Sequence, residues 1–141
     1  MPTEACKKEI EEVLIKTSEG CKLNLKYFNP FTGYYFSEYL YNILGPAYNN
    51  HDNVDDRMAD IACSMQTVFE NILVHLITIL KKKTLSNNFV MSGGCSLNSK
   101  ANGIILRKKI FEKFYIPSSA GDCGVALGAA YLNTFEKNKS F

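Results

Sequence analysis

The sequence predicts an α/β fold, and three features carry this prediction. A long helical pattern of apolar residues covers Asp55–Lys83. Two short apolar runs, Phe89-Val-Met91 and Phe114-Tyr-Ile116, are then each followed by a glycine-rich turn and a helical pattern. Repeated strand–helix units favour parallel strands joined by right-handed crossovers.

Length and composition indicate one domain's worth of chain with a packed core. The chain has 141 residues, of which 46% are hydrophobic, including nine Phe and eight Tyr. The formal net charge is only +2, and no basic stripe is interleaved with aromatic residues. We therefore expect no nucleic-acid partner.

The cysteines and the apolar segments predict a reducing compartment and no membrane partner. No pair among the five cysteines has CxxC spacing, so neither a disulfide framework nor a zinc site is expected. Met1–Glu12 is polar and lacks the apolar segment of a signal peptide. The most apolar stretch, Ile72–Leu80, is too short to span a bilayer. The cytoplasm is the expected location.

Four elements are expected in the first part of the chain. Glu4–Lys16 has apolar residues on one helical face, and Ser18-Glu-Gly20 should end this helix. Lys22–Phe28 alternates polar and apolar residues, which predicts a half-buried strand. The aromatic segment Tyr34–Leu44 should form a helix that ends at Gly45-Pro46.

The helix predicted over Asp55–Lys83 is the clearest element. Its apolar residues recur at three- and four-residue steps, and Asn53 or Asp55 can cap its start. Lys81-Lys-Lys83 suits the negative end of the helix dipole better than it suits phosphate binding. His75 lies beside the apolar stripe, where a satisfied core or boundary residue is a better interpretation than a ligand.

The remaining chain should contain the two strand–turn–helix units and a tail. Phe89–Met91 and Phe114–Ile116 are the strands, and a helix from about Leu97 to Lys109 lies between them. The last helix should start near Asp122, and residues from about 134–141 form a polar tail.

The first glycine turn, within Met91-Ser-Gly-Gly-Cys-Ser-Leu-Asn98, has two interpretations. Gly93 and Gly94 permit positive φ and let a flat ligand approach the backbone, but a tight turn with nothing bound explains them equally well. The turn is neither a Walker A loop nor a GxGxxG motif. Asn98 could bond a sugar hydroxyl or phosphate, or it could bond the loop backbone. Asn102-Gly103 either joins this cluster or only shapes the helix.

The second glycine turn, Ala120-Gly-Asp-Cys-Gly124, raises the question of a metal. Asp122 follows Gly121 at an expected helix start, so on spacing alone a helix N-cap is favoured over a metal ligand. A catalytic metal needs more than one protein ligand. The only other histidine, His51, lies in an expected loop, and no HxxxH or HExxH pair exists.

Both turns resemble motifs of one enzyme family. Ser92–Gly103 and Pro117–Ala130 resemble the O-carbamoyltransferases of the nodulation and antibiotic-tailoring type, whose pattern reads SGGxALNxxANG and then a proline followed by GDxGxALGAA. The resemblance covers most of the chain, from about Leu23 to Leu132. Cys95, Ser96 and Lys100 depart mildly from residues that are usually apolar or smaller.

The resemblance implies a fold and a site. Residues 1–141 would be the second, C-terminal lobe of a catalytic domain with the actin-like ATPase (ribonuclease H-like) fold, a mixed sheet with packed helices. Four residues would bind the nucleotide: Gly93, Gly94, Asn98 and Gly121. Asp122 would be a ligand of an iron-type divalent metal whose histidine ligands lie in the first lobe.

The implied activity is transfer of a carbamoyl group from carbamoyl adenylate to a small-molecule hydroxyl. In the family a separate domain makes this adenylate from ATP and carbamoyl phosphate, so the isolated chain is expected to be inactive. One alternative is a non-catalytic lobe that binds nucleotide or protein, with a first-lobe partner or a second copy covering its apolar face. Another is a lobe of a tRNA threonylcarbamoyl transferase, which the ALGAA ending and the near-neutral charge disfavour.

Overall fold

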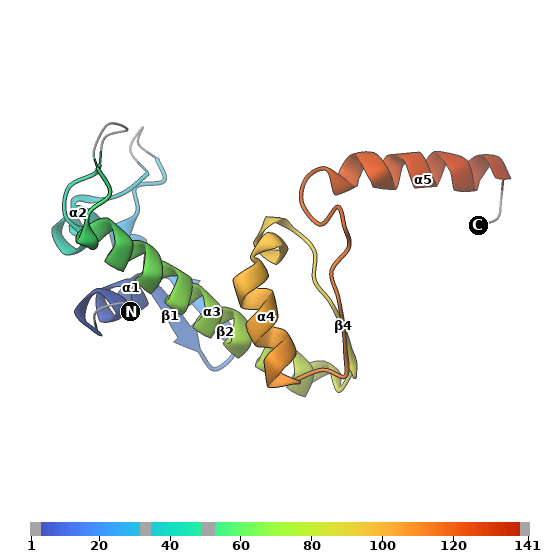
Figure 1. Ribbon diagram of the computed structural model, residues 1–141, viewed down its shortest axis with the longest axis horizontal. Coiled ribbons are helices and arrows are strands. Elements are labelled where there is room, and N and C mark those ends of the chain that lie inside the picture. The colour runs from blue at the N-terminus through green and yellow to red at the C-terminus, as the bar shows by residue number, and fades with distance from the viewer. Residues whose placement is uncertain (1–3, 32–34, 49–52, 139–141) are drawn as a thin grey trace. The chain divides into compact units, whose positions relative to one another are not determined.

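The computed structural model describes residues 4–31, 35–48 and 53–138. The chain divides into two compact units, Met1–Leu80 and Lys81–Phe141, whose α-helices and most of whose strands are labelled in Figure 1.

The first unit contains helices and one hairpin. Its elements are α1 (Glu4–Val13), β1 (Leu14–Thr17), β2 (Gly20–Leu23), the 3-10 helix η1 (Leu25–Tyr27), α2 (Glu38–Leu44) and most of α3 (Asp56–Thr84). Strands β1 and β2 are antiparallel, with Leu14 opposite Leu23 and Thr17 opposite Gly20. The core consists of Cys6 and Ile10 from α1 packed with Val68 and Ile72 from α3.

Two sequence predictions for this unit were wrong at the hairpin. The helix expected over Glu4–Lys16 ends at Val13, because the next four residues pair with β2. The strand expected over Lys22–Phe28 ends at Leu23. There the Asn24 side chain accepts a hydrogen bond from the Lys26 N–H (N···O 3.3 Å) and starts η1 instead. Of the predicted break at Ser18-Glu-Gly20, Ser18 and Glu19 form the hairpin turn and Gly20 begins β2.

Helix α2 is shorter at its start than expected. It begins at Glu38, and Tyr34, the predicted first residue, lies outside the described part of the chain. The predicted end is confirmed: Gly45 has φ 80° and its N–H bonds the Tyr41 carbonyl at 2.8 Å.

The long helix is confirmed as α3. Asp55 caps it, because its carboxylate accepts a hydrogen bond from the Met58 N–H at 2.7 Å. At the other end, Lys81 Nζ donates to the Ser86 carbonyl at 2.7 Å and to Asn87 Oδ1 at 2.8 Å. The predicted role of this lysine run at a helix end is thus supported.

Helix α3 is also long and apolar enough, by length and composition, to cross a membrane. The core helices of soluble proteins can have the same length and apolar composition, so one such helix is weak evidence for a membrane segment. In the described residues, α3 contributes Val68 and Ile72 to a protein core.

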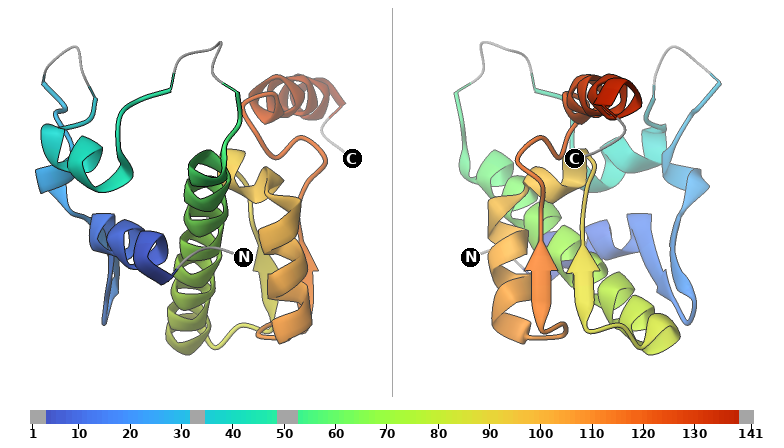
Figure 2. Two further views of the ribbon diagram at one scale, coloured as in Figure 1. Left: turned by 60° about the vertical axis from the view of Figure 1, so that its left-hand side comes forward. Right: turned by 90° about the vertical axis from the view of Figure 1, so that its right-hand side faces the viewer.

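The second unit contains β3 (Asn88–Val90), the 3-10 helix η2 (Gly94–Leu97), α4 (Ser99–Lys108), β4 (Lys113–Tyr115) and α5 (Gly124–Asn138). Strands β3 and β4 are parallel, as predicted, with Phe89 opposite Phe114. Figure 2 shows α4 lying alongside this strand pair. The Phe89 ring stacks on Phe111 (centroids 4.9 Å apart) and on Phe114 (5.4 Å). This aromatic stack holds the strands to the segment that joins α4 and β4.

The predicted α/β class is confirmed, while its finer architecture is not. In the described residues, the named strands form two separate two-stranded sheets, one antiparallel and one parallel, rather than a single mixed sheet. The actin-like lobe stays a prediction.

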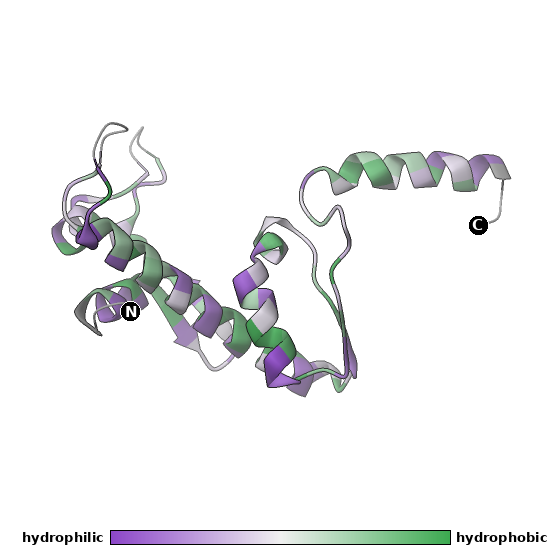
Figure 3. Ribbon diagram, viewed as in Figure 1, coloured by the Kyte–Doolittle hydropathy of each residue, from purple (hydrophilic) through white to green (hydrophobic). Residues whose placement is uncertain are grey.

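Helix α5 begins at Gly124, two residues after the predicted start at Asp122. It runs to Asn138 and so includes the first residues of the segment predicted as a polar tail. Its residues 125–137 are all exposed, including Val125 at 77% and Leu132 at 58%. Figure 3 shows that the first half of α5 is the more hydrophobic. This helix therefore presents apolar side chains to the surroundings.

Candidate functional site

The two glycine-rich turns lie at the same edge of the second unit and are bonded to each other. The carboxyl ends of parallel strands meet at one edge of a sheet, so the turns after β3 and β4 are neighbours. The Gly93 N–H donates to the Ala120 carbonyl with an N···O distance of 2.7 Å, and Ser92 Oγ reaches the same oxygen at 3.4 Å. Ala120 is only 3% exposed. This buried backbone contact brings Gly93 beside the turn that contains Gly121 and Asp122.

Gly93 and Gly94 serve different purposes. Gly93 has φ 97° and ψ 165°, a conformation that residues with a Cβ rarely adopt. A Cβ atom added at Gly93 or at Gly94 would meet nothing within 4 Å. Gly93 is therefore required by the backbone, whereas Gly94 leaves open space beside the chain.

A hydrogen-bond chain fixes this turn from the inside. The Gly93 carbonyl accepts bonds from the Ser96 N–H at 2.9 Å and from Ser96 Oγ at 2.7 Å. Asn102 Nδ2 in turn donates to the Ser96 carbonyl at 2.7 Å. Ser96 is 1% exposed. Sequence reasoning treated Ser96 only as a mild departure and left Asn102 undecided. The signal available in the sequence was Ser96 itself, a hydroxyl-bearing residue at a position where the family pattern has the smaller alanine.

Asn98 caps helix α4. Its Oδ1 accepts a hydrogen bond from the Ala101 N–H at 3.0 Å, and its φ of −74° and ψ of 90° are typical of an N-cap. Of the two roles that the sequence left open, the structure shows the bond to backbone, in the form of a helix cap. Contact with a sugar or phosphate stays a prediction.

The second turn is held by backbone bonds and by a close approach. The Gly121 carbonyl accepts the Gly124 N–H at 2.9 Å, and the Asp122 carbonyl accepts the Val125 N–H at 3.2 Å. The Asp122 side chain is exposed. A Cβ added to Gly124 would lie 2.4 Å from the Ser119 carbonyl oxygen. Only glycine therefore fits at position 124.

An open depression of about 420 Å³ lies at these turns and the start of α5. It is lined by Ser92, Pro117, Ser119, Gly121, Gly124, Val125, Leu127, Gly128 and Tyr131. Ligand pockets commonly have volumes of about 300–1,000 Å³. The depression is thus large enough for part of a small ligand next to Gly121.

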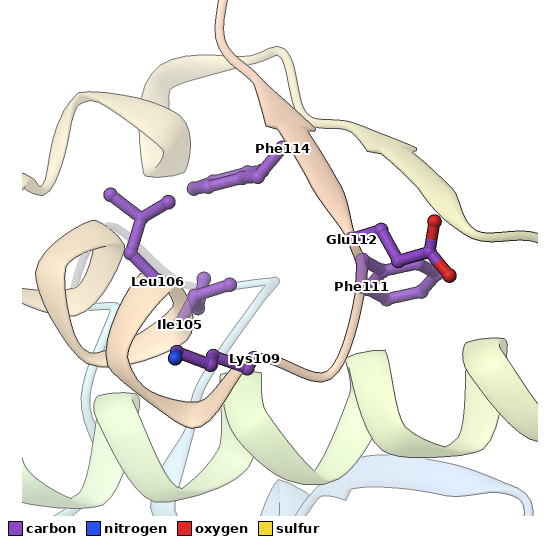
Figure 4. Close-up of a pocket in the computed structure, with 6 residues that line it drawn as sticks. All are labelled: Ile105, Leu106, Lys109, Phe111, Glu112 and Phe114. Carbon is purple, nitrogen blue, oxygen red and sulfur yellow. The ribbon is translucent and has the colours of Figure 1, made fainter.

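A different depression of the second unit contains none of the predicted site residues. It measures about 380 Å³ and is lined by residues of α4, β4 and the segment between them. Figure 4 shows Ile105, Leu106 and Phe114 on one side of it, with the Glu112 carboxylate pointing away from Leu106. Its apolar lining is typical of a packing surface.

The described residues do not form a metal centre. Across residues 4–31, 35–48 and 53–138, no group of three or more His, Cys, Asp and Glu side chains is placed to hold an ion. His51 lies outside the described residues. Asp122 alone supplies too few ligands for a catalytic metal.

His75 is satisfied by the hairpin, as predicted. Its Nε2 lies 2.8 Å from the Thr17 carbonyl oxygen and 3.1 Å from that of Gly20. Since carbonyls only accept, this nitrogen carries the proton. His75 therefore holds the turn between β1 and β2.

Comparison with known proteins identifies the family. Residues 3–131 match the family model described as the carbamoyltransferase N-terminus. The chain belongs to the carbamoyltransferase family. This finding confirms the resemblance seen in the two glycine turns, both of which lie within the matched residues up to 131.

Three relatives show the extent of the similarity. The uncharacterised protein sll1178 of Synechocystis is 33% identical over 82% of this chain. Nodulation protein NolNO of Sinorhizobium fredii is 32% identical over 57% of it, and NolO of Bradyrhizobium diazoefficiens 31% identical over 55%. The aligned regions make up 19%, 12% and 14% of these relatives, respectively. This carbamoyltransferase chain thus spans a small part of each relative.

Proposed function

We propose that this chain forms the part of a carbamoyltransferase catalytic domain that holds the nucleotide of carbamoyl adenylate. The observation that carries the proposal is the bonded pair of glycine turns beside an open depression, within residues that match the family. We further propose that the domain has an actin-like architecture, of which this chain is the second lobe.

The proposed reaction is carbamoyl transfer to a hydroxyl group. Carbamoyl adenylate, when bound, supplies an activated carbamoyl carbon that a substrate hydroxyl attacks, with AMP as the leaving group. This chain contributes binding and orientation. Gly94 lets the nucleotide approach the backbone and Gly121 lines the depression, while Gly93 shapes the turn and Asn98 fixes the start of α4.

For the iron-type metal, Asp122 is the proposed contribution of this chain. Asp122 is exposed, and its neighbour in the sequence, Gly121, lines the depression. Because the described residues do not complete a metal centre, the other ligands would come from elsewhere in a carbamoyltransferase. We expect the isolated chain to lack transferase activity.

Calorimetric titration of the purified chain with ADP tests the nucleotide proposal. Gly94→Val places a side chain into the open space at the turn, where nothing lies within 4 Å. It should weaken ADP binding at least about tenfold while leaving the melting temperature nearly unchanged. Gly20→Ala is the matched control, because its Cβ would meet only Leu76 at 3.8 Å in the first unit. Equal affinities for wild type and Gly94→Val would contradict the proposed site.

A second candidate is a protein-interaction lobe, and the exposed face of α5 favours it. Val125, Leu127 and Leu132 are 77%, 40% and 58% exposed. Surfaces of this kind are typical of contacts with another chain or domain. We propose that the partner is another part of a carbamoyltransferase polypeptide, since the aligned relatives are five or more times longer than the matched region. Light scattering after gel filtration tests this choice of partner against a second copy: a dimer that Leu132→Glu converts to a monomer would show that α5 binds another copy of the chain and would contradict the proposed partner.

A further inference from the structure

The peptide between Gly93 and Gly94 is held in one orientation. Its carbonyl oxygen accepts two hydrogen bonds from Ser96, at 2.9 and 2.7 Å. In a trans peptide the C=O and N–H bonds point in opposite directions, and the described chain contains no cis peptide. The Gly94 N–H therefore points away from the Ser96 groups that bond the Gly93 carbonyl. Separately, a Cβ added at Gly94 would meet nothing within 4 Å.

The two glycines differ in what they can offer a ligand. The Gly93 N–H is already engaged by the Ala120 carbonyl at 2.7 Å. In the described part of the chain, neither the Gly94 N–H nor the Cys95 N–H has a hydrogen-bond acceptor. A ligand that accepts a hydrogen bond at this turn would therefore meet the Gly94 N–H rather than that of Gly93.

Helix α4 anchors the orienting bonds. Asn102 lies in the first turns of α4, and its Nδ2 donates to the Ser96 carbonyl at 2.7 Å. Asn102 Oδ1 is buried and has no hydrogen-bond partner among the described residues. The amide is therefore held by its Nδ2 bond, which connects the backbone of η2 to a helix whose start Asn98 caps.

We propose that Ser96 and Asn102 are positioning residues that aim the Gly94 N–H at the nucleotide. The inference rests on the proposed function and deepens it by naming the donor and the side chains that orient it. Ser96 stands where the carbamoyltransferase pattern has alanine, so its hydroxyl bond to Gly93 is a feature of this chain rather than of that pattern. Neither side chain touches the ligand in this arrangement; both act through the Gly93–Gly94 peptide.

Four variants separate positioning from general stability. Ser96→Ala removes the hydrogen bond from the Ser96 hydroxyl to the Gly93 carbonyl. Asn102→Ala removes the hydrogen bond from Asn102 Nδ2 to the Ser96 carbonyl. Ser64→Ala is the matched control, because Ser64 is 0% exposed and its Oγ has no hydrogen-bond partner among the described residues. Asn102→Asp keeps the shape of the side chain but loses the donor, so it reproduces the Asn102→Ala effect without leaving a cavity.

The first readout needs no ligand. Amide NMR should show a shifted Gly94 signal and faster hydrogen exchange of the Ser96 N–H in Ser96→Ala and Asn102→Ala, and neither change in Ser64→Ala. The second readout is the dissociation constant for ADP. It should rise about three- to tenfold in Ser96→Ala and in Asn102→Ala, which is the loss expected for one hydrogen bond.

Each outcome has a definite meaning. If the Gly94 amide signal and the hydrogen exchange of the Ser96 N–H were unchanged in both Ser96→Ala and Asn102→Ala, the positioning role would be overturned, whatever the affinity for ADP. Altered signals with unchanged ADP affinity would show that Gly94 does not contact the nucleotide and would overturn the inference as well. Wild-type protein that binds no ADP would count against the proposed function itself, and the ligand-free readout would still decide whether Ser96 and Asn102 orient the peptide.

Discussion

The Gly93 N–H donates a hydrogen bond of 2.7 Å to the carbonyl oxygen of Ala120, twenty-seven positions later in the sequence. This bond joins the turn after β3 to the turn after β4, and its acceptor is 3% exposed. Both motifs through which the chain resembles the carbamoyltransferases are therefore parts of one structural unit. A substitution in either turn should therefore alter the structure of the other turn.

Gly93→Ala should destabilise the second unit, whereas Gly94→Ala should not. Gly93 has φ 97° and ψ 165°, a region in which a non-glycine residue costs about 1–3 kcal/mol. Gly94 does not have a positive φ, and a Cβ added there would meet nothing within 4 Å. Urea unfolding followed by far-UV circular dichroism measures both variants. Equal stabilities for the two would contradict the separate roles assigned to these glycines.

Gly124→Ala should be destabilising and Gly128→Ala neutral or stabilising. The added Cβ at 124 would lie 2.4 Å from the Ser119 carbonyl oxygen, so the backbone must shift at a cost of about 1–3 kcal/mol. At 128 the Cβ meets nothing within 4 Å, and alanine favours a helix interior by about 0.5–1 kcal/mol. Thermal melts of the two variants check this difference in sign, and the same sign for both would show that the turn before α5 is less tightly packed than described.

His75→Ala should loosen the β1–β2 hairpin. The Nε2–H bonds the carbonyls of Thr17 and Gly20 at 2.8 and 3.1 Å, and losing a donor to partly buried acceptors costs about 1–2 kcal/mol. Hydrogen exchange of the β1 and β2 amides measures the effect. Thr78→Val on the same helix removes only a bond to the Val74 carbonyl within α3 and is the control. Unchanged hairpin exchange in His75→Ala would show that the bond contributes no stability.

Asp55 should make the start of α3 sensitive to acid. The Met58 N–H, followed by the Tyr48 hydroxyl, holds the pKa of the Asp55 carboxyl below its ordinary value. A carboxyl with a lowered folded-state pKa stabilises the fold above its unfolded-state pKa, and this contribution is lost as the pH falls through the folded-state value.

Asp55→Asn isolates this contribution, because asparagine caps helices equally well but carries no charge. The stability advantage of the wild type over Asp55→Asn should be constant above about pH 5 and shrink below about pH 4. Tyr48→Phe, which removes one donor to the carboxylate, should reduce the advantage without abolishing it. Urea midpoints from pH 6 to 3 measure it, and parallel profiles for wild type and Asp55→Asn would contradict the prediction.

The sequence predicted the long helix and the two strand–turn–helix units because their periodicity is local. Apolar steps of three and four define α3, and the short apolar runs place β3 and β4 to within one residue. The hairpin was missed because Leu14 and Ile15 continue the apolar face of α1. Residues 14–17 form a strand because they pair with residues 20–23, and this pairing is not visible in the local pattern.

The candidate site was predictable in its residues but not in their roles. Glycines at 93, 94 and 121 are visible as a motif, whereas the Gly93–Ala120 bond joins segments far apart in sequence. The N-cap favoured at Asp122 is not formed: α5 begins two residues later, at Gly124, and backbone hydrogen bonds to the Gly121 and Asp122 carbonyls lead into it.

Amide NMR during titration with ADP tests the central claim most directly. The account predicts that signals of residues 92–98 and 121–124 shift together, since the two turns share one hydrogen bond, and that Gly94→Val abolishes these shifts. Shifts elsewhere, or no shifts from a folded sample at millimolar ADP, would show that this chain does not hold the nucleotide at the paired turns.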